Sequence, residues 1–248
     1  MIFNVMINGL PVRAYYSQES IDRIFMPLLK HLTDLQMKKK RRLIVFLAAP
    51  CAAGKSTLAS FLAYLSRTDE RLTPICAIGM DGFHRYQDYL TTHTMKRDGM
   101  EVMMVNYKGA PETFDLPKLT SALTELRCGE RNTWPIYDRP SHNPIEDAVT
   151  IDEEIVLLEG NYLLLDEPGW NALSYQADYT IKIIADEADL RDRLIDRKIK
   201  SGSSKEAAEA FVDRSDLYNA KTVLTKSKPA MLTLMLKADD TYDIGPAS

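Results

Sequence analysis

The sequence contains little cysteine, little histidine and no long hydrophobic run, and each shortage excludes a class of protein. Its three cysteines in 248 residues form no C-x-x-C pair, which indicates reduced thiols rather than a disulfide framework. Its four histidines have no zinc-ligand spacing. The longest mostly apolar run, residues 43–53, is about half as long as a membrane-spanning helix, so we expect no membrane partner. The first ten residues lack the basic segment of a secretory signal, and we therefore expect a cytoplasmic protein.

The chain also lacks an excess of positive charge. Its 31 Lys and Arg are outnumbered by 35 Asp and Glu, and the formal net charge is -4. Because affinity for a polyanion comes mainly from phosphate neutralisation by Lys and Arg, we expect no nucleic-acid partner. A basic cluster at residues 38–42 departs from this balance. It is typical of the solvated last turn of a helix, and the alternative is a patch for nucleic acid or anionic lipid.

The remaining composition is that of an ordinary globular protein, with 45% apolar and 27% charged residues. Residues 2–16 alternate in polarity on both sides of a turn at Asn8-Gly9 and predict a β-hairpin. A stripe of apolar residues then predicts a helix that begins at Glu19 or Ser20 and runs to about Lys38. We expect residues 1–40 to form this hairpin-helix extension, docked on a main domain of residues 41–248.

Beyond residue 42 the pattern changes to short apolar runs separated by amphipathic segments. Continuous rather than alternating apolar runs indicate strands buried on both faces, which is typical of a mainly parallel sheet in an α/β protein. The expected strands are residues 43–49, 74–80, 154–160, 179–185 and 230–236. The expected helices are residues 55–66, 116–127, 187–200 and 204–226. Residues 83–113 show no clear periodicity, and a long irregular insertion of this kind is usually functional.

Residues 49–56 read A-P-C-A-A-G-K-S, the P-loop pattern with Ala49 in place of the usual first glycine. The pattern lies between a strand and a helix, which lets backbone N–H groups and the helix N-terminus surround a phosphate. Lys55 is expected to contact the β- and γ-phosphates of a nucleotide, and Ser56 to ligate Mg²⁺ through its hydroxyl. Thr57 is the weaker alternative for that hydroxyl. The predicted nucleotide-binding residues of the loop are Pro50, Cys51, Ala52, Ala53, Gly54, Lys55, Ser56 and Thr57.

Two acidic residues lie at the ends of other apolar strands. Asp81 follows residues 74–80, and ligands of open α/β sheets bind at the carboxyl ends of the strands. Such a carboxylate can accept the proton of an attacking hydroxyl; the alternative is a turn cap before Gly82. Glu159 is placed to hold Mg²⁺ or its water shell, unless it is an ordinary strand-end acid. No N-K-x-D motif of GTPases follows, which disfavours a GTP switch.

The motifs APCAAGKST, MDGFHRY, KGAPETFD, WPIYDRPSHNP and LLEGNYLLLD together resemble the phosphoribulokinase / uridine kinase / bacterial pantothenate kinase superfamily. The similarity is greatest to its nucleoside/nucleotide kinase-like branch of proposed pantothenate and fructose-transport kinases, and it covers about residues 40–237. It implies a P-loop NTPase fold, a three-layer α/β sandwich with a mainly parallel sheet. It also implies that Asp81 is the general base and that Glu159 is the acid near Mg²⁺. The residues that it places in or beside the acceptor pocket are Lys108, Asp115, Tyr137, Arg139 and His142.

The family also has a mobile helical lid whose arginines reach the transferring phosphates, and the matching segment here is about residues 190–204. Arg193 and Arg197 are four residues apart and share one helix face, as a clamp on a triphosphate requires. The alternative is a surface helix stabilised by pairs such as Asp189 with Arg193. Whether Arg191 also serves the lid stays open.

Two further residues carry alternatives. Asn219 matches a position that the family often places near the nucleotide, and it is otherwise an exposed helical residue. His84 follows the proposed base by three residues and is either a hydrogen-bond donor in the substrate pocket or a satisfied loop histidine.

These patterns together predict an ATP- and Mg²⁺-dependent kinase that phosphorylates a hydroxyl of a small polar metabolite, such as a sugar, a nucleoside or a pantothenate-like compound. Lys55, Arg193 and Arg197 would stabilise the transferred phosphoryl group, and Asp81 would act on the acceptor. The alternative is a nucleotide-binding regulatory protein with weak or no ATPase activity. The family analogy also leaves room for a homodimer.

Overall fold

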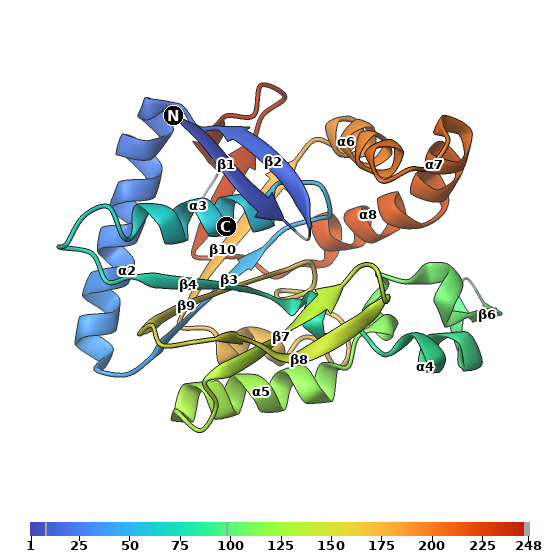
Figure 1. Ribbon diagram of the computed structural model, residues 1–248, viewed down its shortest axis with the longest axis horizontal. Coiled ribbons are helices and arrows are strands. Elements are labelled where there is room, and N and C mark those ends of the chain that lie inside the picture. The colour runs from blue at the N-terminus through green and yellow to red at the C-terminus, as the bar shows by residue number, and fades with distance from the viewer. Residues whose placement is uncertain (8, 98, 246–248) are drawn as a thin grey trace.

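The computed structural model describes residues 1–245 apart from residues 8 and 98. Its main sheet has six strands in the order β12-β11-β10-β3-β9-β4 (Figure 1). Neighbouring strands from β4 to β11 are parallel, and β12 pairs antiparallel with β11. The bounds are β3 Leu43–Ala48, β4 Ile75–Gly79, β9 Ile155–Gly160, β10 Tyr179–Ala185, β11 Leu232–Leu236 and β12 Tyr242–Ile244. The prediction of a mainly parallel sheet is therefore confirmed.

The sheet is covered on both faces, which is why its central strand is apolar throughout. All six residues of β3 are buried. Leu43, Val45 and Leu47 belong to a core shared with α2 (Met26–Lys39) and α3 (Lys55–Leu65). The alternate residues of β3 belong to a second core, shared with α5 (Leu116–Cys128). Figure 1 shows α2 and α3 on one side of the sheet and α5 on the other, so the fold has three layers.

The N-terminal segment forms the predicted hairpin and helix. Strands β1 (Ile2–Ile7) and β2 (Leu10–Tyr15) pair antiparallel; Asn8 of the expected turn lies outside the described residues. The helix begins earlier than expected, with α1 at Gln18–Ser20, because the side chain of Ser17 accepts a hydrogen bond from the Ser20 backbone N–H. A π-helical turn, Ile21–Phe25, leads into α2. The hairpin packs on α3, where the ring of Tyr16 stacks on Phe61 with centroids 3.9 Å apart.

The basic cluster of residues 38–42 begins in the last turn of α2 and connects this helix to other parts of the fold. Arg41 and Lys39 form ion pairs with Asp178, at 2.6 Å and 3.0 Å, and the Asp178 side chain is only 3% exposed. Burial by itself would raise the pKa of this carboxyl, but hydrogen bonds from Arg41 and from the Ile44 backbone N–H leave the pKa below its ordinary value. Arg42 donates to the backbone carbonyls of Leu126, Arg131 and Ile151. These arginines therefore join elements of the protein.

Several elements of the structure differ from the predictions. Residues 83–113 are not wholly irregular, since they contain a short helix and a hairpin, with bounds α4 Gln87–Thr92, β5 Thr94–Arg97 and β6 Met100–Met103. A second hairpin, β7 (Thr133–Asp138) with β8 (Asn143–Thr150), was not predicted because Pro135 and Pro144 interrupt the strand pattern. The helix expected over residues 204–226 is divided by a π-helical turn, with bounds α7 Lys205–Phe211, turn Val212–Asp216 and α8 Leu217–Lys226.

No helix in the described part of the chain is both long and apolar enough to span a bilayer. The three cysteines, Cys51, Cys76 and Cys128, are all free thiols.

Candidate active site

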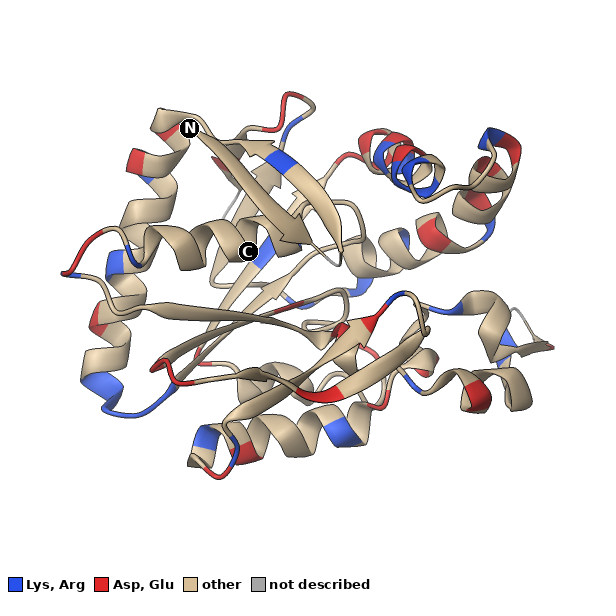
Figure 2. Ribbon diagram, in the orientation of Figure 1, with Lys and Arg blue, Asp and Glu red and all other residues tan. Residues whose placement is uncertain are grey.

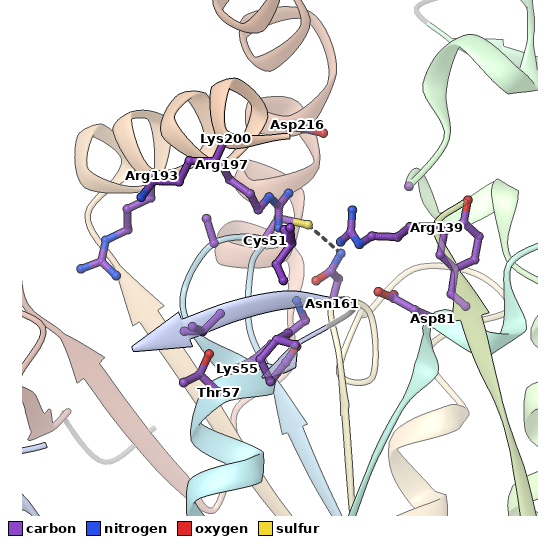
Figure 3. A pocket seen from close by; sticks show the side chains of 18 of the residues that line it. Cys51, Lys55, Thr57, Asp81, Arg139, Asn161, Arg193, Arg197, Lys200 and Asp216 are labelled. Carbon is purple, nitrogen blue, oxygen red and sulfur yellow. Dashed lines mark hydrogen bonds between the residues drawn. The ribbon is translucent and has the colours of Figure 1, made fainter. Parts of the chain in front are cut away.

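A cleft of about 720 Å³ lies at the carboxyl end of the sheet. The P-loop forms its floor, and α6 (Glu187–Lys200), the η2 turn (Met80–Phe83), the β7–β8 hairpin and β2 form its walls. Figure 3 shows Arg193 and Arg197 at one side of the cleft, Lys55 and Thr57 below them, and Asp81 and Arg139 opposite. The predicted site residues that line it are Cys51, Ala52, Gly54, Lys55, Ser56, Thr57, Asp81, His84, Lys108, Tyr137, Arg139, Arg193 and Arg197.

The P-loop connects β3 to α3 through two left-handed backbone positions. Ala52 has φ +66° and Gly54 has φ +73°. Gly54 also approaches the hydroxyl of Tyr242, which would lie 3.4 Å from an added Cβ. A residue with a side chain would therefore be strained in the left-handed conformation of Gly54. The remaining loop residues, Pro50 and Ala53, are buried beneath the loop and do not line the cleft.

Lys55 and Ser56 line the cleft, and both side chains lie close to Glu159. In the register of β3 with β9, Glu159 lies beside Leu47, next to the start of the P-loop. The Ser56 hydroxyl donates a hydrogen bond of 2.6 Å to Glu159 Oε1, and Lys55 Nζ lies 4.0 Å from Glu159 Oε2. Burial raises the pKa of Glu159 despite the opposing effect of Lys55. Burial by itself would lower the pKa of Lys55, but Glu159, Cys51 and Asp81 outweigh it and leave the pKa raised.

The hydroxyl of Ser56 and the carboxylate of Glu159 are hard oxygen donors of the kind that Mg²⁺ prefers. In the described part of the chain, no three His, Cys, Asp or Glu side chains form a metal cage. Mg²⁺ in kinases is held by few protein oxygens together with substrate phosphates and water, so this donor set fits it. Glu159 and Ser56 also border a smaller cavity of about 160 Å³, which Asp81 lines as well.

Asp81 lies in the η2 turn directly after β4 and lines both cavities. Its carboxylate accepts no hydrogen bond from any described residue, so the geometry gives no support to the turn-cap alternative. Its backbone carbonyl oxygen instead forms a hydrogen bond of 2.9 Å with Nδ1 of His84. The next residue, Gly82, allows β7 to pass closely: an added Cβ would lie 2.2 Å from the carbonyl oxygen of Pro135.

Aromatic rings surround His84 on the acceptor side of the cleft. Its ring centroid lies 3.9 Å from that of Phe114 and 5.0 Å from that of Tyr137. Burial lowers the pKa of His84, which favours the neutral imidazole. Lys108 lies 5.0 Å from the centre of the Tyr137 ring and donates to the backbone carbonyl of His142 at 2.8 Å. Partial burial lowers the pKa of Lys108 to about 8.

Besides Pro50, Ala53 and Glu159, three further residues predicted for the site lie outside the lining of the cleft. Asp115 caps α5, where its Oδ1 accepts a hydrogen bond of 3.1 Å from the Lys118 backbone N–H. The side chain of His142 is exposed at the end of the β7–β8 turn, and only its carbonyl reaches Lys108. Asn219 is a buried residue of α8 rather than an exposed one, and its Oδ1 has no hydrogen-bond partner among the described residues.

The helix α6 carries the predicted lid arginines. Arg193 forms an ion pair with Asp240, whereas Arg197 has no ion pair among the described residues. Asp189 is not the partner of Arg193 in the structure. Arg191 pairs with Asp213 at 2.7 Å and does not line the cleft.

Sequence reasoning missed several residues of the cleft. Asn161 lines it and donates through Nδ2 to the Cys51 sulfur at 3.1 Å. Its place two residues after Glu159, at the end of the same strand, was a signal that could have identified it. Asp216, in the π-helical turn, and the strand β2 also line the cleft, and no pattern in the sequence connects either of them to the P-loop.

Residues 44–215 match the model of the Phosphoribulokinase / Uridine kinase family. The chain belongs to this family. It is a P-loop kinase, and its reaction class is phosphoryl transfer to an alcohol. Kinases of this family use ATP. The predicted P-loop fold and kinase class are both confirmed.

Individual relatives of this kinase cover most of its length. It is 41% identical over 243 residues to the uncharacterized protein YggC of Escherichia coli (strain K12), covering 98% of each chain. It is 27% identical over 231 residues to the pantothenate kinase of Lactococcus lactis subsp. cremoris (strain MG1363), covering 86% of this chain and 71% of the relative. A solved structure from Silicibacter sp. TM1040, named as a candidate fructose transport system kinase, is 32% identical with a TM-score of 0.71. That match covers 83% of this chain and 98% of the other.

Proposed function

We propose that this kinase transfers the γ-phosphate of ATP, with Mg²⁺, to a hydroxyl of a small polar metabolite such as a sugar, a nucleoside or a pantothenate-like compound. The observation that carries the proposal is the position of Asp81. Its carboxylate faces the cleft that Lys55 also lines, and no described residue donates a hydrogen bond to it. A carboxylate in that position is available to the hydroxyl of a bound acceptor.

The nucleotide end of the cleft would bind the phosphates. The backbone N–H groups of the P-loop and the N-terminus of α3 favour the β-phosphate, and Lys55 would contact the β- and γ-phosphates. Ser56 and Glu159 would hold Mg²⁺, which neutralises charge on those phosphates when bound. Arg193 and Arg197 would then contact the phosphoryl group from α6.

The acceptor end would orient the reacting hydroxyl. A backbone carbonyl only accepts hydrogen bonds, so His84 Nδ1 must carry a proton to bond with the carbonyl of Asp81. The lowered pKa of His84 keeps the ring neutral, which leaves Nε2 as an acceptor for a substrate hydroxyl. Tyr137 and Arg139 line the same end and offer hydrogen-bond donors to the rest of the acceptor. Asp81 would take the hydroxyl proton as the oxygen attacks the γ-phosphorus.

The test is ADP release from ATP and Mg²⁺ in the presence of single acceptors from a panel of sugars, nucleosides and pantothenate. We expect at least one acceptor to stimulate ADP release well above the rate without acceptor, and Lys55→Ala to abolish that stimulation. ADP release that no member of the panel stimulates would contradict the proposed acceptor class.

A further inference from the structure

The N-terminal hairpin forms a wall of the cleft. Ile7 of β1 and the first four residues of β2, Leu10 to Arg13, line the cavity together with P-loop residues. The opposite wall is α6, which contributes Arg193, Arg197 and Lys200. Ile7 also lines the smaller cavity beside Ser56, so the end of the hairpin lies close to the N-terminus of α3. A nucleotide in the P-loop would therefore lie between β2 and α6.

The hairpin is held in this position by aromatic packing. The ring of Phe3 lies 5.2 Å from Phe61 of α3, in edge-to-face contact, and Tyr16 stacks on the same ring. The side chains that face α3 are partly buried, and the alternate ones are exposed, with Arg13 among them at the edge of the cleft. Since three-stranded or packed hairpins are stable where isolated ones are not, contact with α3 gives β2 a defined place beside the cleft.

Arg13 has no hydrogen-bond, ion-pair or aromatic-ring partner among the described residues. Only two other arginines of the described chain share this property, Arg139 and Arg197, and both line the same cleft. Each remaining arginine is bound to a carboxylate, a backbone carbonyl or an aromatic ring. The unpartnered guanidinium groups therefore come from three distant segments and meet around one cavity.

Seven Lys and Arg side chains line the cleft against three aspartates, Asp81, Asp196 and Asp216, and this excess of positive charge favours an anionic ligand. A guanidinium presents a planar set of N–H donors that suits phosphate oxygens, and it remains charged at every physiological pH. In Figure 2 a single blue band marks β2, and α6 carries both blue and red residues. Lys55 adds a buried cation at the floor between these two walls.

We infer that Arg13 is a nucleotide-binding residue, which contacts the phosphate groups of ATP from β2, opposite Arg197. The inference rests on the proposed function, because it takes the P-loop as the phosphate site. Arg13 lies outside residues 44–215, which match the family model, so this contact is an addition that the N-terminal extension makes to the family's site. The extension then has a part in binding substrate as well as in covering α3.

The experiment compares nucleotide affinity of Arg13→Ala and Arg13→Lys with that of the unaltered protein. Arg23→Ala is the matched control, because Arg23 belongs to the same extension, is paired with Glu19 on the surface and does not line the cleft. Titrations with ATP and with inorganic tripolyphosphate measure binding without an acceptor. We expect Arg13→Ala to lower the affinity for both ligands by about tenfold. Arg13→Lys should have an intermediate affinity, and Arg23→Ala should bind like the unaltered protein.

The outcomes separate this inference from the proposed function. If Lys55→Ala loses ATP binding while Arg13→Ala stays within twofold of the unaltered protein, the role of Arg13 is refuted and the P-loop site stands. Weakened ATP binding with unchanged tripolyphosphate binding would also refute it, since the contact would then be to the ribose or the base. If neither Lys55→Ala nor Arg13→Ala changes ATP binding, the P-loop assignment itself fails. Matching thermal midpoints would show that each variant is folded.

Discussion

Replacing Asp81 with asparagine tests the chemistry of the proposed reaction most directly. The substitution keeps the size of the side chain and removes its ability to take a proton. No described residue donates a hydrogen bond to the carboxylate, so the exchange to an amide breaks no such contact and should leave the fold intact. Because Asp81 raises the pKa of both Lys55 and Glu159, its removal changes the charge near the phosphates without removing a P-loop group.

The expected result is a large loss of transfer with little change in nucleotide binding. Loss of a general base lowers phosphoryl transfer by about 10² to 10⁴-fold. ATP affinity should stay within a few fold, since the P-loop and Lys55 are unaltered, and removing a negative charge from the cleft favours an anionic ligand. Single-turnover transfer to the identified acceptor measures the first quantity, and nucleotide titration measures the second.

Asp88→Asn is a suitable control for this experiment. Asp88 is an exposed carboxylate of the neighbouring helix α4 and does not line the cleft. Its replacement should leave both transfer and affinity unchanged. Transfer at the normal rate in Asp81→Asn would refute the assignment of Asp81 as the base. A parallel loss of ATP affinity would instead indicate that Asp81 acts mainly in nucleotide or metal binding.

Three further predictions concern the phosphate site, the lid and the fold. Lys55→Ala should lower single-turnover transfer by about 10² to 10³-fold, and near-normal turnover would contradict its contact with the phosphates. Hydrogen exchange should show residues 191–204 more protected when an ATP analogue and an acceptor are bound; equal protection with and without them would argue against a lid. Asp178→Asn should lower the free energy of unfolding by about 3 kcal/mol, measured by urea denaturation at neutral pH. Because the pKa of Asp178 is lowered, its stabilisation is present above an ordinary carboxyl pKa of about 4 and declines as pH falls further, and the variant should lack that decline.

The strands and helices that could be predicted are those whose burial shows in the sequence. β3 is apolar at every position because helices cover both of its faces, and α3 follows a motif that requires a helix. The hairpin β7–β8 has neither signal, since most of β8 is exposed and prolines interrupt both strands. The strand β12 has only three residues, too few for any periodicity. Its position is set by pairing with β11.

The part of the site that could be predicted follows from sheet topology. Asp81 and Glu159 lie at the carboxyl ends of β4 and β9, and the P-loop that leads to Lys55 follows the end of β3. Parallel strands bring their carboxyl ends to one edge of the sheet. Asp115 shows the limit of a motif, because a matching position does not determine where a side chain points. Its carboxylate is used by the N-terminus of α5, which needs a cap whether or not the residue is near a substrate.

Unlike the residues at the strand ends, β2 reaches the cleft only through tertiary packing, which the sequence pattern does not indicate. Arg13 and Lys55 are 42 positions apart in the numbering, and neither the alternation of β2 nor its composition indicates a ligand. The stacking of Tyr16 on Phe61 attaches the hairpin to α3, the helix whose N-terminus would bind phosphate under the proposed function. The hairpin therefore lies along α3, and its turn end borders the P-loop. Variants that weaken the Tyr16 contact would therefore alter nucleotide affinity as well as stability, which links the extension to the site through one shared helix.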